Sequence, residues 1–146
     1  MKTTYDIMQI IKDKQFGGER PLFASHDLHI DNVLITEGES ALKECSNIKA
    51  TNCRFEGNYP FWHVHGFEIE NCYFAVGGRS ALWYCDHLKM RDTVIDAPKM
   101  FREMSHLELK NVTMNDADEV FWRCDNIRIE NLKMHGGTYP FMFSHD

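Results

Sequence analysis

The fold is decided by the hexapeptide Gly66-Phe67-Glu68-Ile69-Glu70-Asn71, in which apolar and polar residues alternate before an amide. Strict alternation has the period of a β-strand, because successive side chains point to opposite faces of a sheet, whereas a helix repeats every 3.6 residues. The same pattern, ending in Asn or Asp, recurs at residues 27–32, 47–52, 87–92, 106–111 and 126–131. The chain is therefore built on an internal repeat of short strands.

Three further columns run in phase with these strands. One has spacings of 20, 20, 20, 19, 20 and 20 residues and contains Ser25, Cys45, His65, Cys85, Met104, Cys124 and Ser144. Three residues earlier lies an apolar column of Leu22, Leu42, Trp62, Leu82, Phe101, Phe121 and Phe141. After the Asn position lie Ile35, Phe55, Phe74, Ile95, Met114 and Met134. A period of about 20 residues predicts an all-β solenoid of roughly six coils, in which each coil buries its apolar residues against its neighbours.

The residues that end the alternating runs form a predicted asparagine ladder: Asn32, Asn52, Asn71, Asp92, Asn111 and Asn131. These positions are in phase with the inward apolar residues, so we expect their side chains to lie inside the solenoid, at a bend. Asn adopts the left-handed conformation at low cost, and its amide can bond the next coil. The residues before each strand, such as Asn47, Gly66 and His87, also tolerate positive φ, which predicts a second tight bend.

An Asn ladder on a coil of this length resembles the right-handed parallel β-helices of the pectin-lyase-like kind. Four segments more closely resemble a bacterial family of such proteins, a domain of unknown function: Gly18-Glu19-Arg20-Pro21-Leu22-Phe23, Asn71-Cys72-Tyr73-Phe74, Ala81-Leu82-Trp83-Tyr84 and Asp96-Ala97-Pro98-Lys99-Met100-Phe101. The resemblance runs from about Lys14 to Asp146 and implies a right-handed parallel β-helix without an assigned reaction.

A four-sided pentapeptide-repeat helix is the alternative fold, because Cys53 and Phe55 follow Ile48 and Ala50 by five residues. The five-residue step then fails, since the positions ten residues after Ala50 and Ile69 hold Pro60 and Arg79, which are poor core residues.

Composition narrows the classes of partner and compartment. The 146 residues suit one domain, and 16 basic against 22 acidic residues give a net charge of −6. That charge disfavours nucleic acid and anionic membranes as partners. We find no run of 18 apolar residues and no secretion signal at the start of the chain, and the five cysteines include no C-x-x-C pair. A reduced, cytoplasmic protein is expected.

The ends of the chain suggest a cap and an open edge. Thr3-Thr4-Tyr5-Asp6 resembles a capping box, so we expect a cap over residues 1–15 with a helix over 4–13, followed by the β-helix domain at 16–146. At the other end the last coil begins at Phe141 and is not closed. Unpaired strand edges attract other strands. We therefore expect a homo-oligomer through the open C-terminal coil, or a longer parent chain.

Neither the cysteines nor the histidines predict a metal site, and no cofactor is expected. Cys45, His65 and Cys85 share a column, but alternate coils lie about 9.6 Å apart, whereas zinc needs ligands that converge at about 2.0–2.3 Å. The cysteines are expected to be buried thiols.

An acidic loop is the candidate for catalysis. Asp116, Asp118 and Glu119 lie within one loop, and hydrolases and lyases on β-helices use such acids as a general acid and base or as calcium ligands. The simpler interpretation is a solvated loop face.

An outer corner directly after the Leu/Trp/Phe column is the candidate for binding. Its predicted ligand-binding residues are His63, Trp83, Tyr84, Arg102, Trp122 and Arg123. Stacked coils would place Arg102 between Trp83 and Trp122, and an exposed line of aromatic side chains marks a contact surface.

We therefore expect a non-catalytic binding or interaction module for a glycan or a partner protein. The alternatives are a carbohydrate-active enzyme, either a polysaccharide lyase or a glycoside hydrolase, and an acidic DNA mimic of the pentapeptide-repeat type.

Overall fold

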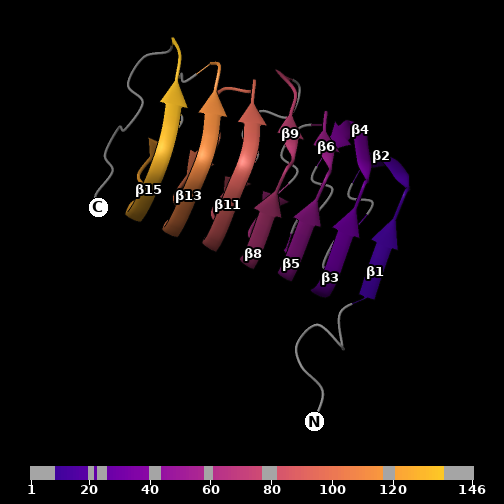
Figure 1. Ribbon diagram of the computed structural model, residues 1–146. Helices are drawn as coiled ribbons and strands as arrows, with labels where there is room; N and C mark the ends of the chain where they lie inside the picture. Colours follow the sequence, from indigo (N-terminus) through magenta and orange to yellow (C-terminus); the bar gives the residue numbers. More distant parts are fainter. Residues whose placement is uncertain are drawn as a thin grey trace.

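The computed structural model describes residues 9–19, 22, 26–39, 44–57, 61–76, 82–116 and 121–136. They form a parallel β-solenoid with about 20 residues per coil, as predicted, and about five turns rather than six. Figure 1 shows the strands of one face side by side, from β1 in indigo to β15 in yellow.

The strands of the described residues form three faces. The first face contains β1 (Gln9–Lys12), β3 (His26–Asp31), β5 (Ser46–Thr51), β8 (His65–Glu70) and the first halves of β11 (Asp86–Ile95), β13 (Ser105–Met114) and β15 (Asp125–Met134). The second face contains β2 (Gln15–Glu19), β4 (Leu34–Glu39), β6 (Arg54–Phe55), β9 (Tyr73–Phe74) and the second halves of those three long strands. The third face is a separate sheet of β7 (Phe61–Trp62), β10 (Leu82–Trp83), β12 (Phe101–Arg102) and β14 (Phe121–Trp122). The four-sided pentapeptide alternative is therefore not the fold adopted.

The core consists of ladders of like side chains. Phe55 stacks on Phe74 with ring centroids 4.8 Å apart, and Phe101 stacks on Phe121 at 5.0 Å. All four are fully buried. Each coil is too short to enclose its own apolar residues, so its stability comes from the coils on either side.

The asparagine ladder exists, but it lies on the outside of the bend. Its side-chain amides donate to the preceding coil in five pairs: Asn32 to Asp13, Asn52 to Asp31, Asn71 to Asn52, Asn111 to Asp92 and Asn131 to Asn111. Every member has φ between 51° and 59°, as expected for this bend. The expected inward orientation is wrong because a left-handed residue breaks the two-residue alternation. The next residue points inward instead, as the buried Val33, Cys53 and Cys72 do.

The second predicted bend is confirmed. Positive φ occurs at each residue in question: Asp27, Asn47, Gly66, His87, His106 and Asn126.

The sequence alignment is shifted by one residue in the third coil. Phe61, not Trp62, pairs with Leu82 in the inward column, and Trp62 pairs with Trp83 on the outside. Val64 is buried beside Cys45 and Cys85, whereas His65 pairs with Ser46 and Asp86 and is exposed. The inward residue of the third coil, Val64, follows Cys45 by one residue less than the assumed spacing of 20. The inward positions of this coil therefore lie one residue earlier than predicted.

The predicted N-terminal helix is wrong where the structure describes it. Gln9–Lys12 form β1, which pairs in parallel with β3 and places Ile11 beside Ile30. Asp13, with φ of 57°, takes the place of the ladder asparagine. Residues 4–8 of the predicted helix lie outside the described residues. An apolar pair such as Ile10-Ile11 fits either period, and the exposed edge of β3 favours the strand.

Candidate functional site

The strongest candidate site is the outer corner of the third face. Each strand of this sheet has two residues, of which the first is fully buried and the second is half-buried and points outward. We call the outward residues the corner column: Trp62, Trp83, Arg102 and Trp122.

A second row of side chains follows directly and forms what we call the turn column: Glu44, His63, Tyr84, Glu103 and Arg123. All five have positive φ, from 52° to 59°. The left-handed turn returns the chain to the core at the next residue, which is Val64 in the third coil and Cys85 in the fourth. The predicted outward bulge between two inward columns is therefore confirmed.

The corner column is a continuous stack. Trp62 and Trp83 lie face to face with centroids 5.8 Å apart and planes inclined by 21°. The guanidinium carbon of Arg102 lies 4.7 Å from the Trp83 ring centroid and 5.6 Å from that of Trp122. A guanidinium over an indole face is attracted by the ring quadrupole. Arg102 is thus held between two indoles, as the sequence predicted.

A hydrogen bond fixes Trp83 of this stack to the backbone. The indole Nε1 of Trp83 donates to the carbonyl oxygen of Lys99 at 2.9 Å, and Lys99 has φ of 55°. The segment before β12 therefore holds the Trp83 ring in place, and it is anchored in the core by the buried Ala97 and Met100.

The turn column carries its own contacts. The His63 and Tyr84 rings stack at 5.1 Å with an angle of 11°, and Tyr84 is 36% exposed. Nη1 of Arg123 lies 3.5 Å from Oε1 of Glu103. All six residues predicted as a binding site thus lie on one corner.

Trp62 is the member that sequence reasoning missed. The signal was the dipeptide Phe-Trp, which occurs both at Phe61-Trp62 and at Phe121-Trp122. Aligning these two dipeptides, rather than keeping a spacing of 20, would have placed Trp62 outside.

A polar network on the second face was also not foreseen. The Tyr73 hydroxyl donates to Asp96, and the Asn115 amide donates to the same carboxylate at 2.6 Å. These two donors hold the pKa of Asp96 below its usual range, and the bond to Asp96 raises the pKa of Tyr73. The guanidinium of Arg54 lies 4.5 Å from the Tyr73 ring centroid and pairs with Glu56 at 2.6 Å. The network satisfies its members internally, which favours a stabilising role.

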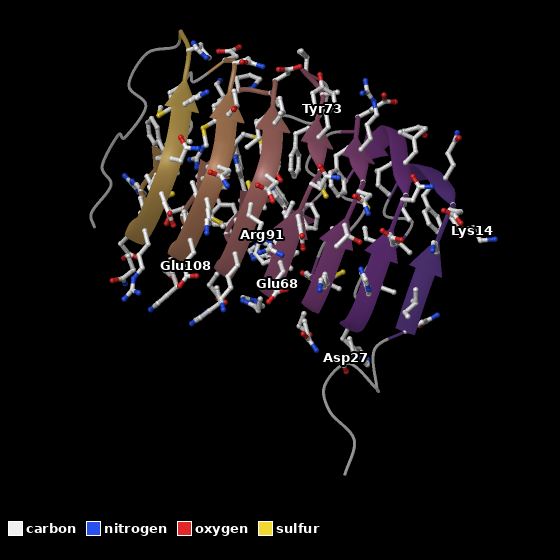
Figure 2. All side chains as sticks on the ribbon, in the orientation of Figure 1. Lys14, Asp27, Glu68, Tyr73, Arg91 and Glu108 are labelled. Carbon is white, nitrogen blue, oxygen red and sulfur yellow. The ribbon has the colours of Figure 1, made fainter. Side chains whose placement is uncertain are left out.

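The first face presents charged rows along a shallow hollow. Figure 2 shows Glu68, Arg91 and Glu108 projecting from neighbouring strands of this face. Arg91 pairs with Glu70 at 2.9 Å, and Lys110 lies 3.9 Å from Glu130. One row alternates in sign along the solenoid: Lys49, Glu68, Lys89, Glu108 and Arg128. Pairing between coils is enough to explain these charges.

One of the three predicted acidic residues lies among the described residues. Asp116 is exposed, whereas Asp118 and Glu119 lie outside the described residues.

In the part of the chain that the structure describes, the cysteines are buried and two histidines contact a carboxylate. All five cysteines are buried thiols. Burial raises the pKa of Cys124 to about 12, and that of Cys85 is raised further. Nδ1 of His65 and of His87 lie 2.7 Å and 3.0 Å from the Asp86 carboxylate, and His87 stacks on His106 at 4.5 Å. Within the described ranges, no three of these side-chain types gather as metal ligands would.

The comparison with protein families covers nearly the whole chain. Residues 9–146 match a family described as a protein of unknown function, DUF3737. The chain belongs to this family. A search of curated proteins and a search of solved structures find no match.

The DUF3737 match includes every coil that the structure describes, and with them the corner and turn columns. The description of the DUF3737 family names no reaction. Among its described residues there is no helix with the length and apolarity needed to cross a membrane.

Proposed function

We propose that the protein is a non-catalytic binding module that engages a partner protein through the corner and turn columns. One observation carries the proposal: a row of half-buried indole edges and a guanidinium, Trp62, Trp83, Arg102 and Trp122, crosses four coils without interruption. Trp, Tyr and Arg are the residues that dominate binding energy at protein interfaces.

A protein partner suits this corner better than a glycan. Sugar rings stack on free aromatic faces, yet Trp83 has Trp62 on one face and Arg102 on the other. What the corner offers outward is ring edges, the exposed Tyr84 and a guanidinium edge. Such edges pack against apolar and carboxylate side chains of a protein.

The other two functions have less support. A carbohydrate-active enzyme would need two opposed carboxylates, and the acid whose placement is described in the predicted loop, Asp116, lies on the surface. An acidic DNA mimic would carry regular rows of acids, whereas the row through Lys89, Glu108 and Arg128 alternates in sign.

Panning a displayed library of random peptides on the folded protein tests the proposal. Selected peptides are then measured against two corner variants, Trp122→Gln and Tyr84→Asn, the second of which keeps a residue that tolerates positive φ. The matched control is Lys89→Gln/Glu108→Gln on the first face, which removes one charge of each sign.

We expect peptides that bind the wild type and the first-face control equally and lose affinity for both corner variants. Circular dichroism and melting curves establish that each variant is folded. Equal binding to all variants would overturn the proposal. Binding of neutral glycans on an array, with loss in both corner variants, would also overturn it, by making a glycan the partner.

A further inference from the structure

We propose that Arg102 forms a carboxylate-binding site, which anchors one acidic side chain of an otherwise apolar peptide segment of the partner. This inference rests on the proposed function of the corner and names the group that is recognised there. The chemistry of the partner is an Asp or Glu flanked by apolar residues.

The surroundings of Arg102 set it apart from three other described arginines. Arg54, Arg91 and Arg123 lie 2.6 Å, 2.9 Å and 3.5 Å from Glu56, Glu70 and Glu103. The neighbours of Arg102 in the adjacent coils are Trp83 and Trp122, which have no negative charge. Glu103, the acid next in sequence, already pairs with Arg123.

Arg102 is also incompletely hydrogen-bonded. Its Nε is buried, and among the described residues no acceptor lies within hydrogen-bond distance of that atom. A buried donor without an acceptor is costly, and guanidinium groups bind carboxylates through two parallel hydrogen bonds. A carboxylate at the outer edge of this guanidinium would accept two parallel hydrogen bonds from its terminal amino groups, while the buried Nε lies out of reach of the ligand.

The two indoles make this a built site rather than a mobile surface charge. They cover both faces of the guanidinium, which removes water from it and fixes its plane. A planar group held in one orientation loses less entropy when a ligand binds. Only the edge of the guanidinium remains for the ligand, and a carboxylate can meet it in the same plane.

The charge of the whole protein limits how acidic the ligand is. The net charge of −6 repels polyanions at long range. One carboxylate can bind Arg102, while its apolar neighbours pack on the indole edges and on Tyr84. Acidic polymers such as polygalacturonate or polyglutamate are therefore poor ligands.

The experiment uses synthetic peptides of the sequences selected by panning on the wild-type protein. Binding is followed by intrinsic fluorescence, because all three tryptophans of the chain lie in the corner column. The peptides are compared with copies in which Glu or Asp is replaced by Gln or Asn. The protein variants are Arg102→Met and Arg102→Lys, with Arg128→Met on the first face as the matched control.

We expect Arg102→Met to weaken binding by about tenfold to 100-fold, the usual range for a charged hydrogen bond. Arg102→Lys keeps the positive charge but not the planar pair of donors, so its affinity should fall between those of the wild type and Arg102→Met. Replacing the acidic residue of the peptide with its amide, Gln or Asn, should weaken binding to the wild-type protein as much as Arg102→Met does. The same replacement should change the affinity for the Arg102→Met variant little. A merely structural role for Arg102 would not produce this coupling.

The results separate the two proposals. Some peptides could lose affinity for the corner variants yet carry no acidic residue, or keep their affinity when that residue is replaced by Gln or Asn. Such peptides would overturn the proposed carboxylate site and leave the proposed binding module in place. Peptides that bind the corner variants as tightly as the wild type would overturn both the binding module and the carboxylate site. Tight binding of polyglutamate or polygalacturonate would contradict the expected apolar ligand.

Discussion

The side-chain amide of Asn71 donates to the side-chain oxygen of Asn52 at 2.6 Å, one coil away and on the solvent side of the bend. Both residues have φ near 50°, at 52° and 55°. The backbone N–H of Asn52 bonds to the carbonyl oxygen of Glu70, and that of Asn71 to the carbonyl oxygen of Arg91. The ladder therefore couples coils twice, through side chains outside and through the backbone at the bend.

Replacing Asn71 with Ala should lower the free energy of unfolding by about 1–3 kcal/mol, because a hydrogen bond is lost and Ala is strained at positive φ. Urea unfolding followed by circular dichroism measures the change.

Asn71→Gly is the matched control, since Gly adopts positive φ without strain but also lacks the amide. We expect it to lose less stability than the Ala variant. If Asn71→Ala unfolds like the wild type, neither the bond nor the left-handed bend matters for stability.

The repeat, the parallel strands and the left-handed positions were predictable, because periodicity of two and the chemistry of Asn and Gly are local. The orientation of the ladder was not. Extrapolating the alternation of Phe67 and Ile69 places Asn71 inside, but a left-handed residue turns the chain and restarts the alternation at Cys72. Sequence shows where such a turn is tolerated and not how it changes the phase.

The six predicted corner residues lie together because each follows a buried residue of the third face by one position, in the corner column, or by two, in the turn column. Trp62 was missed because the spacing between coils was taken as constant. The Tyr73–Asp96 pair could not be found by periodicity, because its members occupy different positions in their coils and meet only when the coils stack. Contacts within a column can be predicted from a repeat, and contacts between columns need the structure.

The corrected register of the third coil makes a direct prediction about Val64 and His65. Val64 is fully buried, so Val64→Ala should cost about 1–3 kcal/mol of stability through lost burial and a cavity. His65 is exposed and contacts the Asp86 carboxylate, so His65→Ala should cost less than about 1 kcal/mol. Thermal or urea unfolding of the two variants compares them. The reverse order would restore the original alignment, with His65 inside.

The Asp96 network predicts a dependence of stability on pH. Hydrogen bonds from Tyr73 and Asn115 lower the pKa of Asp96 in the folded state, so the native protein releases this proton more readily than the unfolded chain does. The resulting stabilisation is present above the unfolded pKa of about 3.9 and is lost as pH falls through the folded value.

Wild type should therefore be more stable than Asp96→Asn at pH 7, and the difference should shrink below about pH 4. Urea unfolding across this range measures it, with Glu108→Gln on the first face as a control for a general change of charge. A difference between wild type and Asp96→Asn that stays constant down to about pH 3 would mean that Asp96 is not preferentially ionised in the folded protein.

The corner stack has an optical signature. Trp62 and Trp83 are stacked at 5.8 Å, close enough for their indole transitions to couple and give a paired positive and negative band in the far-ultraviolet circular dichroism spectrum. Trp122 is separated from them by the Arg102 guanidinium, so its transition should contribute little to that pair. We therefore expect Trp62→Phe and Trp83→Phe each to abolish the paired band, and Trp122→Phe to leave it in place. Because the three variants remove the same chromophore, a general loss of tryptophan signal cannot produce this difference. A paired band that survives in Trp62→Phe, or that disappears in Trp122→Phe, would mean that the indoles are not stacked in this order. The placement of Arg102 between Trp83 and Trp122 would then be wrong.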